Sequence, residues 1–376
     1  MKSPIKWFGL LVAVAAGALT AAAPVQAADG DGGGGSALFV QTNDAEGNAI
    51  VAYHRNGDGT LTWTATYATG GLGGRQAGAG SDPIASQGSL VRVADAGLLL
   101  GVNSGSATIS VFGTEDGRLH LRQVLSSGGP FPSSFAVHAN LVYVLDAGGD
   151  GYVTGYRIDD GRLDAIPGST RALGLGNAAV PFFLGSPAQA GFTPDGRHLV
   201  VTTKTHNTVD VFSVGHDGLL SPTPVKNAAA PVPFAFRFDG EGRMILNFAG
   251  TSSLETFAVN ADNTITASGA PVSDAQAALC WATPARGFQY TSNTGSNDVS
   301  QFRVNDDGTV TLVNPIAASG IPGATDSAVS GGRFLYVQGG LDSSVHAFSI
   351  GAGGALTAIQ VAAVPDGDDQ EGIAAA

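Results

Sequence analysis

One sequence pattern recurs along this chain and constrains its fold more than any other feature. Three copies stand out, at residues 199–220, 290–313 and 334–359. Each holds a run of β-forming residues, a turn rich in Asn, Ser and Gly, a second run that ends near Phe or Tyr, and a third short run after a Gly-containing turn. Short strands repeated with a period of about 40–50 residues are typical of a β-propeller, in which each repeat forms one blade.

Seven candidate inner strands set the number of blades. Their starts are spaced by about 45 residues, with one longer step, and this spacing suits a four-stranded blade. The starts lie near Leu90, Phe135, Ala188, Pro233, Ala278, Asp326 and Glu371. The sequence therefore predicts an all-β fold, a seven-bladed β-propeller with four-stranded antiparallel blades.

The two ends of the repeat region predict how the ring closes. Residues 37–67 supply three strands with no inner strand before them, whereas the C-terminal sequence EGIAAA has the character of a short strand. When one chain end completes the blade begun by the other, no sheet edge is left exposed. We therefore expect residues 371–376 to close the ring. A frayed tail over residues 366–376 is the alternative.

The N-terminal segment predicts export. Lys2 and Lys6 precede an apolar run over residues 7–23, and Val25-Gln26-Ala27 fits a small-x-small cleavage site. This arrangement is typical of a signal peptide over residues 1–27, and the alternative is a membrane anchor. A flexible Gly-rich linker over residues 28–36 and the propeller over residues 37–376 would follow. The mature protein is expected to be periplasmic or secreted.

Composition limits the classes of partner that this chain is expected to bind. The chain has 18 Lys and Arg against 31 Asp and Glu, a formal charge of −13 that becomes −15 without the two lysines of the signal peptide. Such acidity argues against nucleic-acid binding. No later stretch of about 18 apolar residues predicts a membrane contact after signal cleavage. We expect a monomer without a cofactor whose partner is a small-molecule ligand or another protein.

The repeats resemble those of a known family. Residues 194–214 (PDGRHLVVTTKTHNTVDVFSV) and 286–312 (RGFQYTSNTGSNDVSQFRVNDDGTVTL) are similar to the repeats of the lactonase family of seven-bladed propellers. That family includes the bacterial 6-phosphogluconolactonase type and the carboxymuconate-lactonizing type. The resemblance covers residues 37–376 and implies hydrolysis or isomerisation of a lactone. Stress- and surface-associated propellers of the YVTN type share the repeats, so it also allows a non-catalytic binding or scaffold protein.

The positions that carry the chemistry in that family hold other residues here. Alignment on the turn at residues 192–196 places the family's Arg and His at Ala188 and Gln189, and its Glu at about Lys204. An earlier family His falls on Ser133, and a later Arg falls on Thr294. Because a charged lactone would need such cationic contacts, the sequence predicts a small neutral lactone or ring compound. The long loops between blades would form its site.

Five residues are the candidates for that site. Lys204 and His206 share one turn and are the catalytic candidates, because an ammonium beside an imidazole could polarise a carbonyl group. Solvated turn residues are the alternative. Gln189, Arg237 and Trp281 are the candidates for binding substrate. Arg237 interrupts an aromatic strand, so it either lines the channel or pairs with a nearby acid, Asp239 or Glu241.

Acidic residues near the inner strands raise the question of a metal. Asp82, Asp274, Asp326 and Glu371 could form a carboxylate ring for Ca²⁺, which prefers oxygen ligands. No Asp-x-Asp-x-Asp-Gly loop supports that ring, so we read these residues as general acidity and predict no metal. Cys280, the single cysteine, is read as a buried hydrophobic residue and not as a nucleophile.

Overall fold

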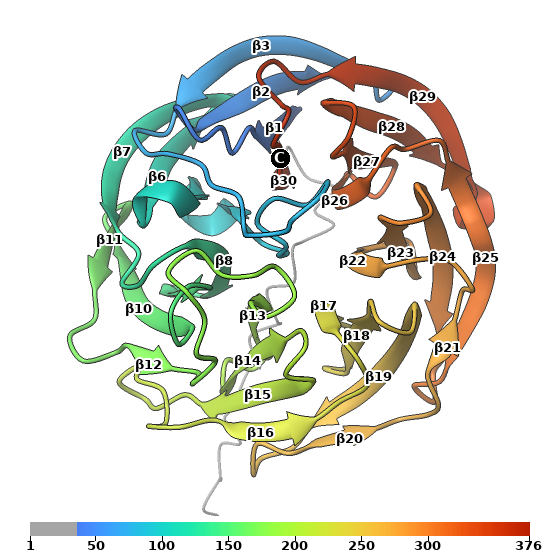
Figure 1. The fold of residues 1–376 in the computed structure, drawn as a ribbon. Helices are drawn as coiled ribbons and strands as arrows, with labels where there is room; N and C mark the ends of the chain where they lie inside the picture. Colours follow the sequence, from blue (N-terminus) through green and yellow to red (C-terminus); the bar gives the residue numbers. More distant parts are fainter. Residues whose placement is uncertain (1–35) are drawn as a thin grey trace, which may run out of the picture.

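Seven antiparallel sheets form a closed ring around a central channel (Figure 1). This computed structural model describes residues 36–376, so the predicted signal peptide and nearly all of the predicted linker lie outside the described residues. The ring confirms the prediction of a seven-bladed β-propeller. Among residues 36–376, no helix is long and apolar enough to cross a membrane.

Each blade runs outward from an inner strand that borders the channel. The blades, from the inner strand outward, are β30 (Ile373–Ala375), β1 (Ala37–Gln41), β2 (Ala49–Arg55) and β3 (Leu61–Ala68); β4 (Leu90–Val93), β5 (Leu98–Asn103), β6 (Thr108–Glu115) and β7 (Arg118–Ser126); β8 (Pro132–His138), β9 (Leu141–Asp146), β10 (Tyr152–Asp159) and β11 (Arg162–Ala165) with β12 (Arg171–Ala172); β13 (Pro187–Phe192), β14 (His198–Thr203), β15 (Thr208–Ser213) and β16 (Val225–Ala228); β17 (Pro233–Phe238), β18 (Met244–Phe248), β19 (Ser253–Val259) and β20 (Ile265–Ala267) with β21 (Val272–Ser273); β22 (Leu279–Ala285), β23 (Phe288–Asn293), β24 (Asp298–Val304) and β25 (Val310–Ser319); β26 (Ala324–Ser330), β27 (Phe334–Gly339), β28 (Ser344–Ile350) and β29 (Leu356–Ala363). In two blades the outer strand is split, because β12 pairs with β10 and β21 pairs with β19 beside the regular outer strands. Three single-turn 3₁₀ helices lie in hairpin turns: η1 (Ala94–Ala96), η2 (Ser104–Ser106) and η3 (Ala352–Gly354).

The C-terminal strand closes the ring as predicted. β30 pairs antiparallel with β1, with Ile373 opposite Val40 and Ala375 opposite Leu38. Figure 1 shows the C-terminus lying against β1 at the inner end of the first blade. The closure removes the free inner edge that β1 would otherwise present.

The hydrophobic core lies between blades, where buried tyrosines form hydrogen bonds from one blade to the next. Tyr143, Tyr290 and Tyr336 occupy equivalent places on the second strands of three blades and are almost fully buried. Each hydroxyl donates a hydrogen bond to a carbonyl oxygen in the outer turn of the following blade, namely Gly218 at 2.8 Å, Gly354 at 2.7 Å and Gly59 at 2.9 Å. Burial raises the pKa of all three phenols. They remain neutral hydrogen-bond donors at physiological pH.

Five inner strands begin with a bulge. The register of the inner strand shifts against the second strand near its first residues in β8, β13, β17, β22 and β26. A bulge leaves a residue outside the ladder and turns its side chain away from the regular strand face. The residues inside these shifts are Ser133, Ala188, Phe234 with Ala235, Cys280, and Thr325 with Asp326. The bulges therefore decide which side chains surround the channel.

Candidate functional site

A segment of the loop between β3 and β4 crosses the central channel. We call residues 84–87 the crossing segment, and Figure 1 shows the blue loop that carries it reaching the middle of the ring. Its backbone receives hydrogen bonds from several blades. Lys204 Nζ donates to the Ala85 carbonyl oxygen at 2.7 Å, and Trp281 Nε1 donates to that of Ser86 at 3.3 Å. These donors come from different blades, which places the segment on the channel axis.

Side chains of the segment and of the inner strands complete this attachment. The Gln87 amide donates to the Ala282 carbonyl oxygen at 3.0 Å and accepts from the Ala282 N–H at 3.2 Å. Ser134 Oγ donates to the Gln87 carbonyl oxygen at 2.7 Å. Because its polar groups are paired within the protein, the segment is a fixed part of the channel.

A pair of carboxyl groups lies beside the crossing segment. Glu371, at the start of the closing strand, accepts the N–H groups of Ile84 at 2.7 Å and Ser86 at 3.0 Å. Its side chain shares a hydrogen bond with Asp82. Burial raises the pKa of Asp82 to about 6, and burial together with the neighbouring Asp82 charge raises the pKa of Glu371 well above its usual range. One proton is therefore held between the two groups near neutral pH.

Glu371 and Asp82 differ in their exposure to solvent. Glu371 is fully buried, whereas Asp82 is partly exposed as a residue, with its Oδ1 buried and its other carboxyl oxygen outside the set of buried unpaired atoms. The pKa of Glu371 is raised further than that of Asp82, even though its two backbone N–H partners lower it, so Asp82 is the member of the pair that ionises first. A carboxylate with a pKa near the ambient pH suits a general base.

Lys204 supplies positive charge to this centre. Its side chain is almost fully buried, and Nζ lies 5.5 Å from the centroid of the Phe234 ring. Burial lowers its pKa to about 8, an effect opposed by the negative charges of Asp82 and Glu371. The same lysine lowers the pKa of Asp82. Lys204 thus holds the crossing segment and stabilises the ionised form of Asp82.

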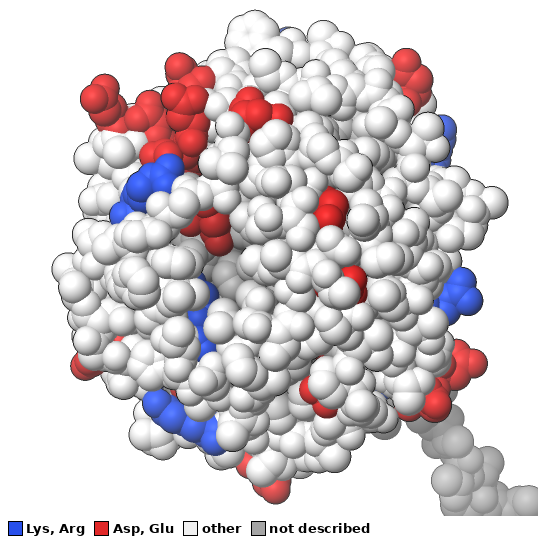
Figure 2. Space-filling view, turned by 45° about the vertical axis from the view of Figure 1, so that its right-hand side comes forward, with Lys and Arg blue, Asp and Glu red and all other residues white. Residues whose placement is uncertain are grey.

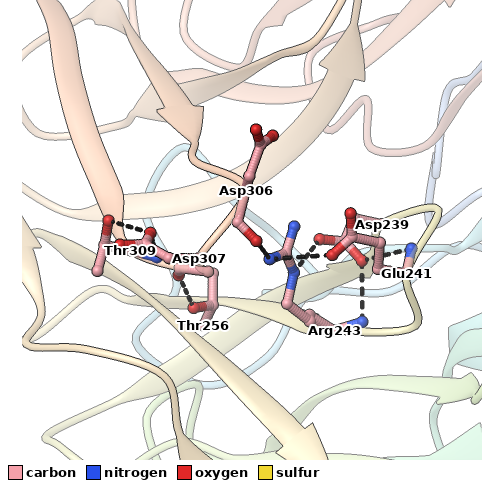
Figure 3. A network of polar contacts seen from close by, with 8 residues as sticks. Asp239, Glu241, Arg243, Thr256, Asp306, Asp307 and Thr309 are labelled. Atoms are coloured by element: carbon pink, nitrogen blue, oxygen red, sulfur yellow. Dashed lines mark hydrogen bonds and ion pairs between the residues drawn. The ribbon is translucent and has the colours of Figure 1, made fainter.

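Arg237 lies in the channel, one of the two alternatives that its sequence left open. Its charge acts on Asp326, although β17 and β26 belong to blades separated by the blade of β22–β25. Only the channel brings two such strands into electrostatic range. The other alternative fails because Arg243 takes both acids: its Nε lies 2.7 Å from Asp239 Oδ2 and its Nη1 lies 3.1 Å from Glu241 Oε2 (Figure 3).

Asp326 is the third acid of the channel. It is almost fully buried and accepts the backbone N–H groups of Ser327, at 2.8 Å, and Ile373. Burial raises its pKa to about 7 in spite of Arg237. Asp274, the fourth member of the carboxylate ring considered above, lies apart, because its oxygens accept from Gln276 and from Ser300 on β24. Among residues 36–376 no group of three acidic, His or Cys side chains is arranged to hold a metal ion.

The structure does not bring the five sequence candidates together. His206 is exposed, and its charge acts on Asp210, whereas Lys204 in the same turn points to the channel. Gln189 joins two inner strands, with its amide paired to both backbone groups of Phe236 at 2.8 and 3.2 Å. Trp281 is fully buried against the crossing segment. Only Lys204 and Arg237 lie with the channel acids.

Two of the sequence interpretations concern single residues of the inner strands. Cys280 is buried, and burial raises the pKa of its thiol, which keeps it protonated and a poor nucleophile. Ala188, aligned with the family's Arg, is a bulge residue in the same buried cluster. The paired function of Asp82 and Glu371 was missed from the sequence. The sequence grouped Asp82 and Glu371 only as candidate metal ligands near the inner strands, and that grouping was the available signal.

The surface shows two hollows of different character. Figure 2 shows a recess near the middle of the ring face, with acidic and basic side chains on its walls. Asp82 and Arg237 are each partly exposed although both lie among the inner strands. A separate cavity of about 370 Å³ lies at the edge of one blade, lined by residues that include Asn140, Arg157 and Asp164. It is far from the channel acids and contains no catalytic arrangement.

Comparison with known proteins shows which solved structures share this fold. No protein-family model matches this sequence, and no curated protein matches it. Among solved structures, the periplasmic gluconolactonase PpgL of Pseudomonas aeruginosa superposes with a TM-score of 0.66 at 18% identity, over 90% of this chain and 99% of that one. A Lactobacillus plantarum protein gives 0.66 at 19% identity, over 89% and 98%. A candidate 6-phosphogluconolactonase of Bacteroides uniformis gives 0.66 at 16%, over 89% and 98%. The chain has the fold of lactonase-type propellers.

Proposed function

We propose that this chain is an exported lactonase-like hydrolase that opens a small lactone at the channel, with Asp82 as the base. The observation that carries the proposal is the carboxyl pair of Asp82 and Glu371. A carboxylate on a partly exposed residue, with its pKa raised to about 6, can accept a proton at neutral pH and return it within one cycle. The family-like repeats and the lactonase-type fold support this choice of substrate.

The reaction needs one proton acceptor and one proton donor. The Asp82 carboxylate would take a proton from water as the water oxygen attacks the lactone carbonyl carbon. The ring C–O bond then breaks, and the proton on Asp82 passes to the departing alkoxide oxygen, which regenerates the carboxylate. Glu371 is a positioning residue, because it holds Asp82 by a hydrogen bond without facing solvent. The same base would also serve an isomerisation that begins with proton removal.

A variant pair tests this function. Purified protein is assayed against a panel of neutral sugar lactones and alkyl lactones, with Asp82→Asn as the test and Asp95→Asn as the control. Asp95 is an exposed acid in η1. Loss of a general base lowers kcat by about 10²–10⁴-fold. Equal turnover by wild type and Asp82→Asn, or no turnover of any lactone by wild type, would reject the proposal.

Export is part of the same proposal. The N-terminal pattern of the sequence supports it, and one protein of the same fold is a periplasmic gluconolactonase. Cell fractionation followed by sequencing of the mature N-terminus should find the protein outside the cytoplasm and beginning at Ala28. A cytoplasmic protein that retains Met1 contradicts export.

A binding or scaffold protein is the second candidate function. The observation that favours it is the crossing segment, which occupies the channel beside Ala188 and Gln189, the positions aligned with family site residues. Affinity purification from periplasmic extract discriminates the two functions. A stoichiometric partner together with no lactone turnover supports the scaffold, and turnover without a partner rejects it.

A further inference from the structure

Arg237 is a cation enclosed by the inner strands with no partner bound directly to it. Among the residues that the structure describes, none accepts a hydrogen bond from its guanidinium and no carboxylate oxygen lies within 4.0 Å of it. Burial lowers its pKa from a value so high that the group stays charged. A guanidinium has five N–H donors, and an enclosed charge without a counter-ion is unfavourable.

The nearest acid does not satisfy these donors. Asp326 acts on Arg237 through its charge, but its carboxylate is engaged by the backbone N–H groups of Ser327 and Ile373. Asp239 and Glu241, the acids closest in sequence, are bound to Arg243. Arg237 is partly exposed as a residue, and its nitrogen atoms are not among the fully buried side-chain atoms that lack a partner. Its donors are therefore available to a species that enters the channel.

We propose that Arg237 anchors a binding site for a small monovalent anion, such as chloride or a short carboxylate, in the central channel. Charge balance favours a monovalent ion, because Lys204, the other cation of the channel, is engaged by the Ala85 carbonyl oxygen and by the charges of Asp82 and Glu371, which leaves Arg237 with Asp326. A dianion would meet more repulsion from Asp326 and Asp82 than the Arg237 guanidinium offsets. The site is independent of the proposed lactone chemistry, because it is detected by binding without a lactone.

Asp326 links this binding to pH. The ionised Asp326 carboxylate competes electrostatically with an anion for Arg237, and the Asp82 carboxylate adds repulsion. Anion affinity should therefore fall as pH rises from 6 to 8, the range over which Asp326 loses its proton. An Asp326→Asn variant should bind the anion more tightly and keep only the smaller pH dependence that Asp82 and Lys204 contribute.

Titration calorimetry and thermal unfolding test the site. Full-length mature protein in a low-salt buffer with a bulky anion is titrated with sodium chloride, sodium formate and, as the dianion arm, sodium sulfate. We expect saturable binding of chloride or formate with a rise in Tm, and weaker binding of sulfate. The two monovalent arms distinguish an inorganic anion from a carboxylate.

Arg237→Gln is compared with Arg118→Gln, which removes one positive charge from an exposed position. Losing the charge-assisted hydrogen bonds should weaken binding by about tenfold or more in Arg237→Gln, with Arg118→Gln unchanged. Should Arg237→Gln fail to fold, Arg237→Lys keeps the charge and should retain saturable but weaker binding. Equal titrations of wild type and a folded Arg237 variant overturn the site, as does the absence of saturable binding to wild type.

Discussion

Asp146 ends β9 at the position that Asn103 occupies at the end of β5 in the preceding blade. Asn103 Nδ2 donates to Ser110 Oγ at 2.8 Å, and Asn293 Nδ2 donates to Ser300 Oγ at 2.8 Å in a third blade. Asp146 faces the equivalent part of β10 as a fully buried carboxyl group, and neither oxygen has a hydrogen-bond partner among residues 36–376. Ser127 lies nearby, but its hydroxyl donates to the carbonyl oxygens of Ala107 and Gly129.

Asp146→Asn should stabilise the protein at neutral and alkaline pH. Burial raises the pKa of Asp146 to about 8, so the folded state holds a proton that the unfolded state releases near pH 4. This contribution to stability is complete below pH 4 and is lost as pH rises toward 8. Asparagine removes the titration and can donate to Thr154, as Asn103 does to Ser110. We expect a gain of about 1–3 kcal/mol at pH 8 in urea unfolding. A variant less stable than wild type at pH 8 contradicts this assignment.

Lys204→Met should loosen the crossing segment. The substitution leaves the buried Ala85 carbonyl oxygen without its donor and removes the positive charge near Asp82. We expect a loss of about 1–3 kcal/mol and, if a lactone is turned over, a pH–rate profile whose lower limb moves to higher pH because the pKa of Asp82 rises.

His206→Ala is the matched control in the same turn. Its ring is exposed, so the free energy of unfolding should change by no more than about 0.5 kcal/mol. Chemical denaturation of both variants makes the comparison. Equal effects of the two substitutions would show that Lys204 does not hold the segment.

Arg243→Met should weaken one contact between blades. Besides its ion pairs with Asp239 and Glu241, Arg243 donates from Nη1 to the Asp306 carbonyl oxygen of the next blade at 2.8 Å (Figure 3). The side chain is 18% exposed, so solvent screens these contacts only in part. A loss of about 1–2 kcal/mol is expected in thermal unfolding.

Arg197→Met serves as its control. Arg197 lies 3.7 Å from Asp195 in the corresponding turn of another blade, with its side chain 80% exposed. An exposed pair of this kind contributes about 0–1 kcal/mol. If Arg243→Met is no more harmful than Arg197→Met, the contact to Asp306 has no role in stability.

Removal of residues 371–376 should open the ring. The deletion takes away β30 and Glu371, which exposes the edge of β1 and frees the backbone of Ile84 and Ser86. We expect a loss of several kcal/mol, at least about 3 kcal/mol, and association through the exposed edge in size-exclusion chromatography. Deleting only Ala376, which donates one backbone hydrogen bond to Ala37, should have a small effect. A monomeric truncated protein with the wild-type Tm would contradict closure in solution.

The sequence by itself determined those features that depend on neighbouring residues. The turns at residues 56–62, 260–266 and 305–311 share the pattern Asn-x-Asp-x-Thr-x-Thr, and in each the Asp Oδ1 accepts both the N–H and the hydroxyl of the first Thr. Every partner lies within seven residues, so the pattern specifies the turn wherever it occurs. The repeated strands and their count follow from such local rules, and the missing inner strand of the first blade predicted the closing strand.

Only the tertiary structure decided which side chains meet at the channel. Asp82 and Glu371 share a proton although they lie far apart in the sequence, in the loop before the second blade and at the closing strand. Lys204 and His206 are close in sequence but lie in different environments. Lys204 is buried at the channel, whereas His206 is exposed to solvent. Burial and long-range charge set the pKa of these groups, and both depend on how seven blades are placed around one axis.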